Sequence, residues 1–155
     1  LISSDCQRID GEDIYAELRR GLEMNGMRRM NIMLIFDTCY VAKFFDDIFK
    51  FPNVYSAKPI DSLETYPSGE SILYGSQLTF IAATTFDQAA GTFKRKDTGK
   101  QNGAVTKVMK EFLEDPEVPK TVEEMIKRLD TACGKFQAPQ ILALLAKPDL
   151  ELLLA

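Results

Sequence analysis

Hydrophobic residues recur at helical spacing in three stretches of the chain. Residues 11–24 carry isoleucine or leucine every four positions, and Asp10 stands directly before them, where an N-cap belongs. Residues 103–114 have a similar apolar side, as do residues 121–133, which open on the capping box Thr121-Val122-Glu123-Glu124. The pattern predicts three amphipathic helices.

Apolar runs without alternation mark a second kind of element. Residues 31–36 and 78–84 are short and apolar, which is typical of strands covered on both faces in a parallel sheet. A short helix is predicted over residues 41–49, and a last strand over residues 136–145, interrupted by Pro139. Strands alternating with helices predict an α/β domain with a mainly parallel sheet flanked by helices.

The remaining segments are predicted loops and a tail. Residues 51–76 contain three prolines and two glycines, too many for a long regular element, and are long enough for a functional loop. Residues 91–102 include the basic run Lys94-Arg95-Lys96 and predict an exposed, mobile loop. The leucine-rich residues 150–154 are expected to pack on the body of the protein or on a partner.

Charge and composition narrow the partners. The 155 residues include 19 Lys and Arg against 23 Asp and Glu, a formal charge of -4, so nucleic acid is not an expected partner. No apolar run reaches the roughly 18 residues of a membrane span. Three widely spaced cysteines fit no disulfide framework and favour a reducing, cytoplasmic location. Because residues 1–5 lack an initiating Met and signal-peptide features, we interpret the chain as part of a longer protein.

Histidine is absent from the sequence, yet one cysteine is placed as a nucleophile would be. Without histidine, this chain alone cannot complete a Ser-His-Asp or Cys-His catalytic site or a histidine-ligated metal site. Cys39 lies three positions after the end of the strand predicted over residues 31–36, where a nucleophile is both rigid and accessible. The alternative is a small buried hydrophobic residue, the common role of a free cysteine. Cys6 and Cys133 are expected to be ordinary core or surface thiols.

The residues around Cys39 resemble a known family. Ile35-Phe36-Asp37-Thr38-Cys39-Tyr40 is similar to the nucleophile strand of caspase-like cysteine peptidases, particularly metacaspases and their bacterial relatives. Further segments resemble that family in the same order: residues 1–5 the segment after its catalytic His-Gly, 9–14 an acidic helix start, 80–90 a strand and Asp-Gln loop, 103–106 a helix start, and 137–140 a Gln-x-Pro-Gln turn. The chain departs from many members at Tyr40, where they have His, and at Val41-Ala42, where they have Ser-Gly.

The resemblance implies a fold and an organisation. The fold would be a caspase-haemoglobinase-like three-layer sandwich formed by a single domain fragment, residues 1–155. Residues 1–50 would end the large-subunit-like part, residues 51–77 would form a linker, and residues 78–155 would form the small-subunit-like part.

The resemblance also implies an activity, a cysteine endopeptidase that cleaves protein or peptide substrates. Cys39 would be the nucleophile, activated by a histidine that lies outside this chain. Asp37 would line the pocket for the residue before the scissile bond and favour Lys or Arg there. Its alternative role is to cap or brace the end of the strand. Thr84 and Asp87 would contribute to substrate binding.

Acidic residues form a second candidate site, and no other cofactor is expected. Some metacaspases hold Ca²⁺ with carboxylates placed like those of Asp10, Glu12, Asp13, Asp46 and Asp47. The alternative is that the first three complement a helix N-terminus and the last two lie on a solvated helix face. Residues 94–100 are either a self-processing site for a Lys- or Arg-specific peptidase or a simple exposed loop.

Two hypotheses of different classes follow. The first is the peptidase, completed by the remainder of its own catalytic domain or by a related subunit. The second is a catalytically inactive caspase-like module with a regulatory or scaffolding role, which pairs with an active relative through its sheet edge or its leucine-rich tail. The absent histidine and Val41-Ala42 favour the second.

Overall fold

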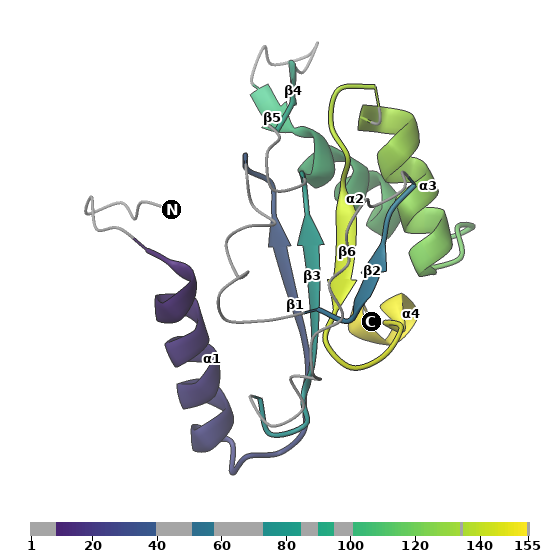
Figure 1. Ribbon diagram of the computed structural model, residues 1–155. Helices are drawn as coiled ribbons and strands as arrows, with labels where there is room; N and C mark the ends of the chain where they lie inside the picture. Colours follow the sequence, from purple (N-terminus) through teal and green to yellow (C-terminus); the bar gives the residue numbers. More distant parts are fainter. Residues whose placement is uncertain are drawn as a thin grey trace.

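The structure is a computed structural model that describes residues 9–39, 51–57, 73–84, 90–94, 101–133 and 135–154. Its main sheet has the strand order β1-β3-β6-β2, and a separate small sheet pairs β4 with β5 (Figure 1). The strands are β1 (Asn31–Phe36), β2 (Asn53–Tyr55), β3 (Gln77–Ala82), β4 (Thr92–Lys94), β5 (Gln101–Gly103) and β6 (Gln140–Ala143). The helices are α1 (Gly11–Met24), α2 (Ala104–Glu114), α3 (Val122–Cys133) and α4 (Leu150–Leu154).

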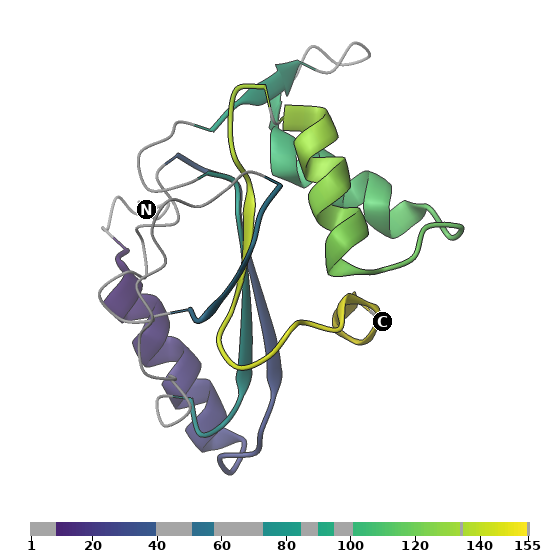
Figure 2. The same cartoon turned by 45° about the vertical axis from the view of Figure 1, so that its right-hand side comes forward.

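Helices cover both faces of the main sheet. In Figure 2, α1 lies along one face, whereas α2, α3 and α4 lie on the other. The inner strand β3 contributes to both cores, because successive side chains of a strand point to opposite faces. Phe80 and Ala82 belong to the core that includes α1, and Ile81 and Ala83 to the core that includes α2 and α3. The α/β class and the flanking helices agree with the sequence prediction.

The sheet is mixed, not mainly parallel as predicted. β1 runs parallel to β3, with Asn31 opposite Gln77 and Phe36 opposite Ala82. β6 runs antiparallel to both β3 and β2. The cause lies in the connection from β3 to β6, which contains two successive helices, α2 and α3 (Figure 1). A single helix after β3 would carry the chain back to the end of the sheet where β3 begins, so that the next strand could run parallel to it. The second helix carries the chain to the end where β3 finishes, and β6 therefore runs antiparallel to β3.

β1 forms an edge of the described sheet, and its side chains contact both cores, with Leu34 and Phe36 on the side of α1 and Met33 on the side of α2 and α3. Its residues are mostly half-buried, and Asn31 and Ile35 are exposed. The inner position belongs to β3, where all residues except Gln77 are buried. The apolar runs of the two strands look alike in sequence, and only their neighbours in space separate them.

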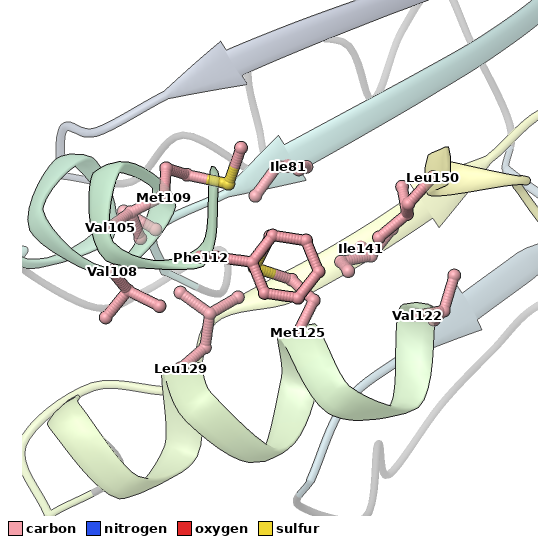
Figure 3. Packing of buried hydrophobic residues seen from close by; sticks show 11 residues of the cluster. Ile81, Val105, Val108, Met109, Phe112, Val122, Met125, Leu129, Ile141 and Leu150 are labelled. Carbon is pink, nitrogen blue, oxygen red and sulfur yellow. The ribbon is translucent and has the colours of Figure 1, made fainter. Parts of the chain in front are cut away.

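The core beneath α2 and α3 is built from large side chains of both helices. Figure 3 shows Phe112 of α2 facing Met125 and Leu129 of α3, with Ile81 and Ile141 of the sheet beside them. All five side chains are fully buried. Burying each contributes about 1.5–3 kcal/mol to the free energy of unfolding, so this packing fixes α2 on the sheet.

Helix α1 begins and ends as its sequence predicts. Asp10 and Asp13 form a capping box, in which each carboxylate accepts a hydrogen bond from the other residue's backbone N–H, at 3.2 and 2.9 Å. Gly26, with φ of +68°, ends the helix in a left-handed turn. The Met27 N–H then donates to the Leu22 carbonyl at 2.8 Å, the bond of a Schellman motif.

Three predicted segments have other outcomes. The proline-rich stretch contains the short strand β2, and the predicted loop over residues 91–102 begins and ends in the paired strands β4 and β5. The helix predicted over residues 41–49 lies outside the described residues.

None of the helices in the described ranges is long and apolar enough to cross a bilayer.

Candidate active site

The carboxyl ends of β1 and β3 bring the first candidate residues to one end of the sheet. Asp37, Thr38 and Cys39 follow β1 directly, and Thr84 lies just beyond β3. Because the two strands are parallel and in register, their carboxyl ends lie at the same end of the sheet. The pairing extends one residue further, since the Ala83 N–H donates to the Phe36 carbonyl at 3.1 Å.

Cys39 is exposed, and its sulfur faces a backbone donor. The Ala90 N–H donates to Cys39 Sγ at 3.2 Å, across 51 positions of the sequence. A backbone N–H directed at a sulfur stabilises negative charge on it, and negative charge is what a thiol nucleophile must carry. The alternative of a buried hydrophobic role is therefore wrong for Cys39. That role does fit Cys133, which is buried and donates to the Leu129 carbonyl at 2.7 Å.

Asp37 lies against the N-terminus of α2. Its Oδ2 accepts a hydrogen bond from the Thr106 N–H at 2.7 Å. The N-cap residue of α2, Gly103, offers no side chain of its own, and a Cβ at that position would overlap the Asp37 carboxylate. Asp37 thus supplies the negative charge and the acceptor that an N-cap side chain normally supplies. The alternative predicted from the sequence placed this carboxylate at the end of its own strand, whereas the observed bond caps a helix far along the chain.

The second carboxylate oxygen of Asp37 is not used in this way. Oδ1 is buried and has no hydrogen-bond partner in the part of the chain that the structure describes. A buried carboxylate oxygen without a partner is costly, so this atom opposes the stability that the bond to Thr106 contributes.

Gln137 is a site residue that the sequence analysis treated only as part of a turn. It is fully buried, and its Nε2 donates to the Ala83 carbonyl at 2.9 Å. Its Oε1 accepts from the Gly91 N–H at 2.5 Å. The side chain therefore joins the exit of β3 to the residue after Ala90. These partners lie 54 and 46 positions away, and no local pattern predicts such contacts.

Thr84 and Asp87 were predicted to bind substrate. Thr84 is fully buried, and its Oγ1 has no hydrogen-bond partner among the residues described. Asp87 lies outside the described residues. A substrate role for either residue stays a prediction.

The acidic residues proposed for Ca²⁺ are only partly described. Asp10 and Asp13 serve the capping box of α1, and Glu12 is exposed in the first turn of the same helix. The described ranges contain no group of three or more His, Cys, Asp or Glu placed to hold a metal ion. Asp46 and Asp47 lie outside the described residues, so calcium binding stays a prediction.

Two hollows of the described surface lie away from Cys39. One, of about 450 Å³, lies at the opposite end of the sheet and is lined in part by Arg29, Gln77 and Pro148. The other, of about 470 Å³, lies beside Ile14 and Leu18 of α1. Neither includes a residue that was predicted as catalytic or substrate-binding.

Comparison with known proteins gives no family assignment. No protein-family model matches this chain, and no curated protein and no solved structure matches it at a significant level. The features that bear on function are therefore the geometry around Cys39 and the order of motifs in the sequence.

Proposed function

We propose that this chain is the nucleophile-bearing part of a caspase-like cysteine endopeptidase of the metacaspase type. The observation that carries the proposal is the placement of Cys39, which is exposed at the carboxyl end of the β1–β3 pair with the Ala90 N–H 3.2 Å from its sulfur. Rigid support from two strands and a nearby donor are what a thiol nucleophile requires.

The proposed reaction needs a base that this chain does not contain. A histidine from the remainder of the catalytic domain, or from a related subunit, removes the proton of the Cys39 thiol. The thiolate attacks the scissile carbonyl carbon, and backbone N–H groups near Cys39 stabilise the resulting oxyanion. Collapse of this intermediate breaks the C–N bond, and the imidazolium gives its proton to the leaving amine. Water then hydrolyses the acyl-enzyme and regenerates the thiol.

The fold supports this assignment. Helices on both faces of the sheet fit the three-layer sandwich that the sequence resemblance implies. The outer edge of β1 is not paired within the described sheet, and β1 ends three positions before Cys39. A strand added at this edge would place its own carboxyl-terminal residue beside Cys39 if it ran parallel to β1. We propose that the histidine arrives in this way.

Asp37 supports a preference for Lys or Arg before the scissile bond. Its negative charge and its position two residues before Cys39 suit attraction of a cationic side chain. Thr84 and Asp87 complete the substrate site in this proposal.

The second candidate is a catalytically inactive module of the same fold. It is favoured by one observation, namely that Asp37 performs a structural task at the N-terminus of α2, which would preserve this residue in the absence of catalysis. The two candidates differ in whether a completed domain can acylate Cys39.

The test uses the chain completed with the histidine-bearing segment, as one polypeptide or as a second subunit. An acyloxymethyl ketone probe carrying Lys should label Cys39, and a matched probe carrying Asp should label it far more slowly. Labelling should vanish in Cys39→Ala. Absence of Lys-probe labelling in the completed domain would support the inactive module.

A further inference from the structure

We propose that Gln137 is a positioning residue for Cys39, because it holds Gly91, the residue next to the Ala90 N–H that faces the Cys39 sulfur. The role of Cys39 as the nucleophile of a peptidase rests on the proposed function. The effect of Gln137 on the reactivity of the sulfur is independent of that function, because it follows from contacts of the described residues alone.

The Gln137 amide makes two hydrogen bonds. Nε2 donates to the Ala83 carbonyl at 2.9 Å, just after β3, and Oε1 accepts from the Gly91 N–H at 2.5 Å, just before β4. The amide therefore joins the two places where the chain leaves β3 and enters β4. Because the side chain is fully buried, water cannot replace either bond without opening the structure.

Gly91 is held from more than one direction. A Cβ at this position would overlap the ring of Phe136 and lie 3.0 Å from Gln137 Oε1, so the absence of a side chain permits the close approach. The Gly91 carbonyl in turn accepts from the Ala104 N–H, in the first turn of α2, at 3.3 Å. Gly91 is thus fixed between the Gln137 side chain and the N-terminus of α2.

The effect of the Gly91 contacts reaches Cys39 through one residue, Ala90. Ala90 directly precedes Gly91, and its N–H is the donor to Cys39 Sγ. When Gly91 is fixed, the Ala90 N–H keeps its direction toward the sulfur and stabilises negative charge there. Glutamine suits this role, since one neutral side chain satisfies a backbone acceptor and a backbone donor together.

A matched control exists at the other end of β3. Gln77 Oε1 accepts from the Leu145 N–H at 2.8 Å, and its Nε2 donates to the Ala146 carbonyl at 2.6 Å. Gln77 thus makes the same two kinds of bond, but at the amino end of β3, away from Cys39. Methionine at position 137 removes two side-chain hydrogen bonds and at position 77 removes three, in both cases with little change in side-chain volume.

The test measures alkylation of Cys39 by iodoacetamide at pH 7 in the 155-residue chain, quantified on the peptide that contains Cys39. Both variants are studied at a temperature where they are folded. Gln137→Met should slow the reaction by about three- to tenfold, whereas Gln77→Met should leave it within about twofold of the unchanged chain. Equal rates in all three proteins, or equal slowing in both variants, would overturn the proposal.

A second variant covers the case in which Gln137→Met does not fold. Gly91→Ala displaces the same amide, and the half-exposed Phe136 ring can move away from the added methyl group. It should also slow alkylation of Cys39, whereas Gly21→Ala, where a Cβ meets nothing within 4 Å, should not. An unchanged rate in Gly91→Ala would contradict the positioning role.

The two proposals can fail separately. If the Lys-directed probe does not label the completed domain but Gln137→Met still slows alkylation, the peptidase assignment is wrong and the positioning role stands. If the probe labels Cys39 but alkylation is unaffected in Gln137→Met, the positioning role is wrong and the peptidase assignment stands.

Discussion

Asp37 leaves β1 with a carboxylate that serves another element 69 positions away. Asp37 therefore meets two demands. It caps α2, and in the proposed peptidase it also attracts a cationic substrate side chain. The two demands can be separated, because an amide can accept a hydrogen bond from a helix N–H without carrying charge.

Substitutions of Asp37 should distinguish capping from substrate attraction. Asp37→Ala removes the acceptor for the Thr106 N–H and should lower the free energy of unfolding by about 1–2 kcal/mol. Asp37→Asn keeps an acceptor and should cost less, but should weaken the preference for a Lys-directed probe. Urea unfolding measures the first effect. Equal stability of Asp37→Ala and the unchanged chain would contradict the capping role.

Gly103 should tolerate no side chain, because the Asp37 carboxylate occupies the space of its Cβ. Gly103→Ala should therefore lower the free energy of unfolding by about 1–3 kcal/mol, the usual cost of overpacking. Gly21→Ala is the matched control. Gly21 lies in the last turn of α1, where a Cβ meets no neighbour, so alanine should raise stability by about 0.5–1 kcal/mol. Thermal unfolding of both variants gives the comparison, and a harmless Gly103→Ala would be inconsistent with the observed packing.

Some residues of the candidate site can be recognised from the sequence around them, whereas others cannot. Cys39 and Asp37 could be singled out because they follow an apolar run directly, and strand ends carry functional residues in α/β proteins. Gln137 and Ala90 could not, because their roles depend on hydrogen bonds to residues about 50 positions away.

At the scale of elements, local signals account for most of the helices. The sequence prediction of residues 11–24 for α1 agrees with the structure at both ends, because capping residues and helix stops act on their own neighbours. The strands β2, β4 and β5 were missed, since three residues are too few to show a period. The direction of β6 was also missed, because it depends on how many helices precede the strand.

The first turn of α3 carries a charge cluster that gives a pH prediction. Arg128 donates to Glu124 Oε1 and to Asp115 Oδ2, both at 3.1 Å. The hydrogen bond from Arg128 holds the pKa of the Glu124 carboxyl below its ordinary value. A carboxyl whose pKa is lower in the folded protein stabilises it above the pKa of the unfolded chain, and loses this contribution as the pH falls through the folded value.

Glu124→Gln should therefore be less stable than the unchanged chain at pH 7, and the difference should shrink toward about pH 3. Glu111→Gln is the control, because the Glu111 carboxylate is mostly exposed and 3.7 Å from Lys107 Nζ. Its effect should be small at both pH values. Urea unfolding at the two pH values measures the difference, and a difference independent of pH would rule out the Glu124 charge as its source.

At the scale of the whole molecule, the leucine-rich tail joins the body of the protein. Leu150 is only 1% exposed and belongs to the core of α2 and α3, whereas Leu152 of the same helix is 63% exposed. Of the two expectations for this tail, packing on the body is confirmed for Leu150. The exposed Leu152 does not contribute to that core.

Matched substitutions in α4 test this division. Leu150→Ala should lower the free energy of unfolding by about 2–4 kcal/mol because it leaves a cavity in the core. Leu152→Ala should stay within about 0.5 kcal/mol of the unchanged chain. Urea unfolding compares them. If the two variants lost equal stability, α4 would not be packed as the structure describes.

The central claim is that the thiol at the end of β1 is the nucleophile of a Lys- or Arg-directed peptidase. The most direct measurement is mass spectrometry of the completed domain after reaction with the Lys-bearing acyloxymethyl ketone. The account predicts a single modification on Cys39, absent in Cys39→Ala and slower in Asp37→Asn. Modification that persists in Cys39→Ala, or a completed domain that takes up no probe, would contradict it.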